Sequence, residues 1–340
     1  MVIVNYCQWG NTKRLVRQLQ QCECWQKGQA RVVIVDNGSS KRGWQEAAPG
    51  VRVRYEWRNV GFAAGVNRGV EELVRWKWGI WRGSSALREW YLLLNPDVTV
   101  RPGFLDEVLT LVEEIAEVEP RAGVIGLRLC NHDGTLQGSC GRFPTLGSTL
   151  RGLLRPRAWR KCQVITSNKR QQVDWVTGGC LLVQRDCFEE LNGLDESFFL
   201  YYEDVDFCKR AQTLGWQIWY EPRLSIIHHW PLHNRNVPAS LRLMTRHALL
   251  QYANKHWSKW SIELINLLIW YESLWRQGWC WLRRDPREYK YYAQLRCLVR
   301  EMRQGKVERV RRRILAVSRH LREVAATQDL ADGQGPFNGW

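Results

Sequence analysis

The first 130 residues alternate short apolar segments with segments of helical periodicity, and this alternation restricts the possible folds more than any other feature of the chain. The apolar segments have strand lengths and cover residues 2–5, 32–36, 51–55, 91–95 and 124–129. The segments between them, 12–21, 63–76 and 103–119, repeat apolar residues at helical spacing. Strands separated by helices predict an α/β fold with a mostly parallel sheet that helices cover on both faces.

The remaining residues divide into an irregular part and a helical part. Residues 131–172 contain Gly, Pro and Arg with few periodic apolar positions, which predicts a long irregular connection. We expect a strand over 173–183, helices over 186–191 and 205–214, and two short strands within 217–227 around Glu221-Pro222. From Pro238 onward the pattern is helical. The predicted organisation is one α/β domain over 1–256, divided near residue 130, then a helical basic extension over 257–325 and a disordered tail over 326–340.

Polar side chains gather where strands of the predicted sheet end. Tyr6, Asp36, Asn37 and Asp97 lie at or just past a strand's carboxyl end, which is where parallel sheets bind ligands. Three glycines within 59–69 lie where a loop becomes a helix, and exposed helix amides there can receive a diphosphate. Each glycine-rich segment by itself is equally typical of an ordinary strand–helix turn.

An acidic cluster, Glu203-Asp204-Val205-Asp206, lies among aromatic residues in a chain of net charge +16. Carboxylates in apolar surroundings are costly unless they have partners. We expect those partners to be a metal ion and a reacting hydroxyl group.

Seven segments follow one another along residues 2–256: VIVNY (2–6), VDNGSS (35–40), NVGFAAGVN (59–67), LNPD (94–97), WVTGGC (175–180), FFLYYEDVDFCKR (198–210) and IIHH (226–229). Together they resemble family 2 glycosyltransferases of the rhamnosyltransferase-like group. The resemblance implies a GT-A fold with a nucleotide-sugar-binding half over 1–130 and an acceptor-binding half over 131–256.

The resemblance also implies which residues bind the donor and a metal. Asp36 would accept a hydrogen bond from the imide N–H of the base. The full implied donor set is Asn5, Tyr6, Asp36, Asn37, Asn59, Gly61, Phe62, Asn67 and Asn95. Asn95-Pro96-Asp97 stands in place of the Asp-x-Asp metal motif, so Asp97 and then His228 would hold Mg²⁺ or Mn²⁺. A histidine packed at a strand end is the alternative for His228.

The reaction implied is a single displacement that inverts the anomeric carbon. Asp204 matches the general base and Glu203 a residue that orients the acceptor or Asp204, whereas we expect Asp206 to be a helix cap or structural partner. Trp175, Gly178 and Gly179 match the acceptor-facing motif, with burial in the core as the alternative for Trp175.

The expected donor is a dTDP-, UDP- or GDP-linked sugar such as rhamnose, and the expected acceptor a glycan or lipid-linked glycan of cell-surface polysaccharide. A non-catalytic sugar-nucleotide binder is the alternative. Charge alone suggests nucleic acid, and because no recognised module accompanies it we do not expect nucleic acid as a partner.

The helical extension carries most of the positive charge, because residues 276–323 supply ten of the sixteen net charges. Segment 264–282 is rich in Leu and Trp, but its polar residues argue against a membrane span. An amphipathic helix on an anionic membrane surface, or a helix packed on the α/β domain, is expected instead. The eleven cysteines follow no disulfide or zinc pattern and the chain begins directly with a strand, so we expect a cytoplasmic protein, peripheral at the inner face of the cell membrane.

Overall fold

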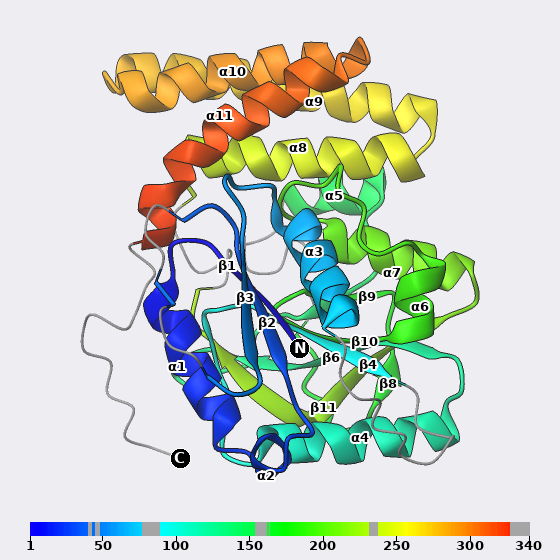
Figure 1. Cartoon of the computed structure of the whole chain (residues 1–340). Coiled ribbons are helices and arrows are strands. Elements are labelled where there is room, and N and C mark those ends of the chain that lie inside the picture. Colours follow the sequence, from blue (N-terminus) through cyan, green and yellow to red (C-terminus); the bar gives the residue numbers. More distant parts are fainter. Residues whose placement is uncertain are drawn as a thin grey trace.

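The structure is a computed structural model that describes residues 1–39, 43–44, 48–76, 89–153, 162, 164–230 and 237–326. It forms a sheet flanked by helices, with a layer of C-terminal helices on one side (Figure 1). The tail over 326–340 that we expected to be disordered lies outside the described residues, apart from Ala326.

Within the part of the chain that the structure describes, the central sheet has nine strands. Its order is β3 (Val51–Tyr55), β2 (Val32–Asp36), β1 (Val2–Asn5), β4 (Trp90–Leu94), β10 (Cys180–Gln184), β6 (Ala122–Cys130), β11 (Gln217–His228) and β5 (Val98–Thr99), with β8 (Gln171–Gln172) paired to β11. Only β10, β5 and β8 run against the others, so the prediction of a mostly parallel sheet is confirmed.

Both faces of this sheet are buried, because alternate residues of a strand pack into two different clusters. On β4, Leu92 and Leu94 join the cluster under α1 (Trp9–Gln20) and α4 (Phe104–Val118), with α2 (Glu23–Gln26) beside them. Leu93 joins the cluster under α3 (Phe62–Arg75), α6 (Arg185–Glu190) and α7 (Glu203–Thr213). The near-continuous apolar strands of the sequence therefore reflect a sheet covered on both sides.

Three expectations for residues 131–228 are wrong in part. Residues 131–172 are not irregular throughout, since they include β7 (Cys140–Gly141), α5 (Leu146–Leu153) and β8. The segment 173–183 is not one strand: β9 (Trp175–Val176) pairs with β7 in a second sheet, and the chain enters β10 only after Gly178-Gly179. Residues 217–228 form one strand rather than two, with an irregularity between Glu221 and Ser225 that accommodates Pro222.

The helical extension consists of α8 (Ala239–His256), α9 (Lys259–Leu282), α10 (Pro286–Arg303) and α11 (Val307–Ala326), as expected from residue 238 onward. These four helices share an apolar cluster of their own that also includes Phe199, so α8 packs with the extension although it precedes residue 257. Within the described residues, no helix combines the length and hydropathy of a membrane span. Much of the Leu- and Trp-rich side of α9 faces outward.

The last helix, α11, runs back from the outer helices towards the start of the sheet (Figure 1). There the Tyr6 hydroxyl donates to the carbonyl of Ser318 at 3.3 Å. The extension thus contacts the loop that follows β1.

Candidate functional site

The glycine pair Gly178-Gly179, between β9 and β10, lies at the centre of the candidate site. The backbone N–H of Gly178 donates to Oδ2 of Asp204 at 3.0 Å. The carbonyl of Gly179 accepts from the N–H of Asn95 at 3.1 Å. A methyl group on Gly178 would lie 3.7 Å from the ring of Phe62, and one on Gly179 would lie 4.0 Å from the ring of His228. Four sequence motifs therefore meet around two residues without side chains.

The acidic residues of the site begin helix α7. Glu203 and Asp204 are both buried in its first turn, where the helix dipole favours negative charge. The two residues before them, Tyr201 and Tyr202, have φ values of 72° and 68°, a region that side chains other than glycine seldom occupy. Such strain commonly accompanies functional sites, and here it turns the chain sharply so that the first turn of α7 faces Gly178.

Asp97 and His228 lie side by side at the paired ends of β5 and β11. Nε2 of His228 is 3.6 Å from Oδ2 of Asp97. The amide nitrogen of Gln137 donates to the carbonyls of His228 and Cys130, so its oxygen faces Nδ1 of His228 at 3.1 Å. Nδ1 therefore donates to Gln137, and Nε2 is the ring nitrogen that faces Asp97.

This pair fits a divalent cation as two ligands of a larger set. One cation can contact both atoms at the roughly 2.0–2.2 Å typical of such bonds, because they are only 3.6 Å apart. Among the described side chains, no group of three His, Cys, Asp or Glu residues could hold a metal. The neighbouring His229 stays neutral, because burial first and then Arg14 lower its pKa to about 4.

At the other end of the site, Asn5 and Asp36 form a buried polar pair where β1 and β2 end. The Asn5 amide donates to Oδ1 of Asp36 at 3.0 Å, and the Ser39 hydroxyl donates to the same oxygen. Burial raises the pKa of Asp36, while the hydrogen bonds from Ser39 and Asn5 oppose that rise. Asn5 thus supports Asp36, and its own oxygen accepts from Thr12 at 3.0 Å.

The loop before α3 is held by two asparagines. The Asn37 amide donates to Oδ1 of Asn59 and to the carbonyl of Gly61, both at 3.0 Å. The N–H of Gly61 in turn donates to Oδ1 of Asn59 at 2.9 Å. Gly61 has a φ of 97°, and a methyl group there would lie 2.7 Å from the carbonyl oxygen of Phe199. The glycine therefore lets this loop approach the chain that leads to Glu203.

No family model matches the chain. The N-acetylglucosaminyl-diphospho-decaprenol L-rhamnosyltransferase of Mycobacterium tuberculosis (strain ATCC 25618 / H37Rv) is 30% identical over 245 residues, which cover 68% of this chain and 78% of the relative. The chain belongs to the rhamnosyltransferase-like glycosyltransferases. The low-salt glycan biosynthesis hexosyltransferase Agl10 of Haloferax volcanii is 26% identical over 72% of this chain and 71% of its own length. The rhamnosyltransferase WbbL of Escherichia coli (strain K12) is 26% identical over 44% of this chain and 55% of its own length.

Solved structures of glycosyltransferases also align with this one. GalNAc-T7 with UDP, GalNAc and Mn²⁺ has a TM-score of 0.48 at 17% identity and covers 75% of this chain and 49% of its own. The mannosyltransferase PcManGT of Pyrobaculum calidifontis, in complex with GDP-Man and Mn²⁺, has a TM-score of 0.46 at 14% identity over 98% of this chain and 87% of its own. The mixed sheet and flanking helices of this glycosyltransferase agree with the GT-A fold expected for it.

Three predicted residues of the glycosyltransferase have structural partners. Trp175 is fully buried and its indole N–H donates to the carbonyl of Arg142 at 3.0 Å, so it belongs to the core and is not retained as an acceptor contact. The Asn67 carboxamide bonds the backbone N–H and carbonyl of Leu194 at 2.9 and 2.8 Å, which ties α3 to the loop before α7. The donor role of Asn67 stays a prediction, as do the roles of the other donor residues.

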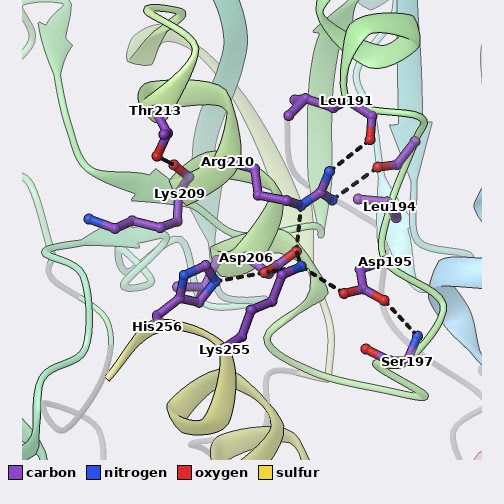
Figure 2. A network of polar contacts seen from close by, with 12 residues as sticks. Leu191, Leu194, Asp195, Ser197, Asp206, Lys209, Arg210, Thr213, Lys255 and His256 are labelled. Carbon is purple, nitrogen blue, oxygen red and sulfur yellow. Dashed lines mark hydrogen bonds and ion pairs between the residues drawn. The ribbon is translucent and has the colours of Figure 1, made fainter. Parts of the chain in front are cut away.

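Asp206 is the third predicted residue that has structural partners. Figure 2 shows it at the centre of an ion-pair network between α7 and α8. Arg210 lies 2.7 Å from its carboxylate, Lys255 2.9 Å and His256 2.7 Å. Burial opposes ionisation, but hydrogen bonds from these three residues hold the pKa of Asp206 below its usual value. This is the structural role that the sequence predicted for it.

Two residues of the glycosyltransferase site escaped sequence reasoning. Gln137 fixes His228 but lies in a segment without periodicity, and a single glutamine there carries no motif. Phe199 contributes through its backbone, because its carbonyl accepts from the N–H of Phe62 at 2.7 Å. Backbone contacts of this kind leave no signal in a sequence.

Proposed function

We propose that this glycosyltransferase is an inverting member of family 2 that moves a sugar such as rhamnose from a nucleotide-linked donor to a hydroxyl group of a glycan or lipid-linked glycan. The carrying observation is the convergence at Gly178-Gly179, where Asp204 lies on one side and the Asp97–His228 pair near the other. An acceptor hydroxyl needs a base and a departing diphosphate needs positive charge, and Asp204 and a cation held by Asp97 and His228 would supply these two groups. The likeness to the mycobacterial rhamnosyltransferase supports rhamnose as the sugar.

The donor would bind along the carboxyl ends of β1, β2 and β4. Asp36, which is held by Asn5 and Ser39, would accept from the base, and Tyr6, which follows Asn5 at the end of β1, would contact the nucleoside beside it. The loop held by Asn37 and Asn59 leads into the N-terminus of α3, where backbone amides favour a diphosphate.

Asp97 and His228 would hold Mg²⁺ or Mn²⁺, with donor phosphate and water completing the ligand set. When bound, the cation supplies positive charge that stabilises a leaving diphosphate. Gln137 holds the His228 ring so that Nε2 would be directed to this position.

Asp204 would act as the general base. The acceptor oxygen forms a bond to the anomeric carbon while the bond from that carbon to the diphosphate oxygen breaks, and the hydroxyl proton passes to Asp204. The hydrogen bond from Gly178 to Oδ2 and the buried position in the first turn of α7 hold this carboxylate in place. One displacement from the face opposite the leaving group inverts the configuration, and Glu203 beside it orients the acceptor.

We further propose that the protein works in cell-surface polysaccharide synthesis, in the cytoplasm and peripheral to the cell membrane. Its acceptor would then be presented on a lipid, as the name of the mycobacterial relative describes for that protein. A non-catalytic sugar-nucleotide binder is the competing function, and transfer activity separates the two.

A transfer assay tests the proposal. Wild-type protein is incubated with dTDP-rhamnose, UDP-sugars and GDP-sugars, a glycan acceptor and Mn²⁺ or Mg²⁺, with and without EDTA. We expect metal-dependent transfer and inverted product stereochemistry. Asp204→Asn should lower turnover about 10²-fold or more with little change in donor affinity, because it removes basicity and keeps size.

Asp186→Asn is the matched control, since Asp186 is an exposed first-turn acid of α6. It should retain wild-type turnover. Donor binding without any transfer by the wild type would favour the non-catalytic binder, and normal turnover by Asp204→Asn would reject the assigned base.

A further inference from the structure

We propose that the outward face of α9 docks on the surface of an anionic lipid bilayer. Six residues define this docking face: Trp260, Leu264, Leu267, Tyr271, Trp275 and Leu282. The proposal rests on the proposed function in one respect, because a transferase with a lipid-linked acceptor must work at a bilayer. Its physical support comes from the distribution of residues around the extension.

The docking face is one continuous stripe. Its residues are spaced by three, four or seven positions, which places them on the same side of a helix. Their exposed fractions range from 41% for Leu264 to 87% for Trp260. A stripe of aromatic and aliphatic side chains left in water is typical of an interaction surface.

The opposite side of α9 is buried and partly polar. Ile265 and Ile269 enter the core of the extension, and Asn266, Ser273 and Gln277 are buried with them. A helix that only served as a packed layer would place its apolar residues inside and its polar residues outside. In α9 half of the buried residues are polar and most of its Trp and Leu residues are exposed, so packing within this chain does not account for those Trp and Leu residues.

Positive charge adjoins the docking face at its C-terminal end. Arg283, Arg284, Arg287 and Lys290 are exposed there. The Arg283 guanidinium lies 4.7 Å from the centre of the Trp279 ring, and Trp279 stacks on Trp275. Tryptophan beside arginine is the combination found where a protein meets lipid headgroups.

Acidic charge is scarce on this side of the helix. The two acids of α9 are engaged elsewhere: Glu263 pairs with Arg303 at 2.7 Å, and Glu272 pairs with Arg246 at 2.8 Å. A chain of net charge +16 is repelled by a second copy of itself and attracted by an anionic surface. Charge therefore favours lipid over a second copy as the occupant.

The helix that carries the docking face is connected to the site through α8. In Figure 1, α8 lies between the sheet and the pair α9 and α10. The Tyr252 ring of α8 packs on that of Tyr202, 5.5 Å between centres, directly before Glu203. A bilayer against α9 would thus be separated from the site by the layer of α8.

Vesicle sedimentation tests the proposal. Full-length protein is mixed with vesicles of phosphatidylcholine alone or with phosphatidylglycerol, at low and high salt. We expect binding to the anionic vesicles that high salt weakens. Trp275→Ser combined with Leu282→Ser should reduce it at least tenfold, and Arg283→Gln combined with Arg284→Gln should weaken its salt dependence.

Trp57→Ser is the matched control, because Trp57 is 81% exposed and carries Arg58 over its ring, but lies in the α/β domain. It should bind vesicles like the wild type. Sedimentation equilibrium is run on each variant. Absence of vesicle binding overturns the proposal, and self-association that Trp275→Ser and Leu282→Ser abolish would replace lipid with a second copy.

Transfer to a water-soluble acceptor is measured in parallel, so that docking and catalysis fail separately. Vesicle binding without transfer would support the docking face and count against the proposed function. Transfer without vesicle binding would support the proposed function and overturn the docking face.

Discussion

Gly61 and Gly178 show how differently two glycines of one site constrain the chain. Gly61 has a positive φ and no room for a methyl group, whereas Gly178 has ordinary van der Waals space towards Phe62 and Asp204. The first glycine is required by folding. The second leaves open the position in front of the proposed base.

Alanine at these two positions should therefore separate stability from activity. Gly61→Ala should destabilise the protein by about 1–3 kcal/mol from its backbone conformation alone, with the contact to Phe199 adding to this. Gly178→Ala should keep the melting temperature and raise the acceptor KM about tenfold or more, because its methyl group would occupy acceptor space. Gly147→Ala, with nothing within 4 Å, is the control. A wild-type acceptor KM in Gly178→Ala would contradict this use of the glycine.

Asp97 and His228 should act as one unit in metal binding. We expect Asp97→Ala to abolish the donor-induced rise in melting temperature that Mn²⁺ supports, and His228→Ala to reduce it, because a bound donor stabilises by mass action. Asp133→Ala, an exposed acid in a nearby turn, should leave it unchanged. An equal rise in the presence of EDTA would show that donor binding needs no cation.

For single residues, the sequence predicted which residues belong to the candidate site better than it predicted which of them contact one another. The order of the motifs placed Asp204 and Gly178 in one site, but their hydrogen bond joins residues 26 positions apart and depends on where β9 ends. For Trp175 the motif was misleading, because its position in the motif did not indicate whether the indole is buried or exposed, and the indole is fully buried.

Among the helices, charge pairs rather than apolar contacts alone fix the orientation of α9 on α8. Glu272 of α9 lies 2.8 Å from Arg246 of α8 and 3.0 Å from Arg276 of its own helix. Burial opposes its ionisation, but Arg246 and Arg276 lower the pKa of Glu272 to about 2. This pair lies on the inner side of the helix that carries the docking face.

The stability that Glu272 contributes should depend on pH in a defined window. Because its folded pKa is depressed, the contribution is complete above the unfolded value of 4.5 and is lost as pH falls towards 2. Glu272→Gln should cost roughly 3–5 kcal/mol at neutral pH, since it leaves a buried Arg246 without its counter-charge. Denaturant unfolding at several pH values measures this.

The exposed pair of Glu263 and Arg303 provides the control. Glu263→Gln should change stability by about 1 kcal/mol at most, as surface ion pairs do. If the Glu272→Gln deficit is the same at pH 3 as at pH 7, the ion pair is not its cause.

The strands and helices of the α/β domain were largely predictable because their apolar periods are clear. Strands that are buried on both faces appear in the sequence as continuous apolar segments. The observed bounds of β1, β2 and β3 equal the predicted ones. The short strands β5, β7 and β8 were missed, since two residues cannot show a period, and β9 was not distinguished from β10. Proline 222 suggested a break in β11, but pairing with β6 continues on both sides of it.

For the whole molecule, the sequence predicted that the extension is helical, but it did not predict how these helices pack on one another. Periodicity indicated α8 to α11, yet the sequence left open which side of α9 faces the protein. Its buried polar residues pair with, or lie among, groups from other helices, and such partners become visible only in three dimensions. The return of α11 to the β1 end of the sheet had no sequence signal.

That return should affect donor binding. Tyr6→Phe keeps the ring but loses the hydrogen bond to Ser318, which contributes about 1 kcal/mol to the folded arrangement, so donor affinity should fall by about fivefold at most with turnover unchanged. Tyr289→Phe, an exposed tyrosine of α10, is the control. Isothermal titration with the nucleotide measures both, and an unaltered affinity in Tyr6→Phe would show that α11 does not support the nucleotide end.

The contact between Tyr6 and Ser318 also bears on the order in which the protein matures during translation. Its two residues are 312 positions apart, so the first loop of the sheet waits for nearly the whole chain to leave the ribosome before it gains this partner. The sheet around β1 can form earlier, since β2, β3 and β4 all precede residue 95. The end of the site around Tyr6, although encoded first, is thus among the last parts of the molecule to be completed.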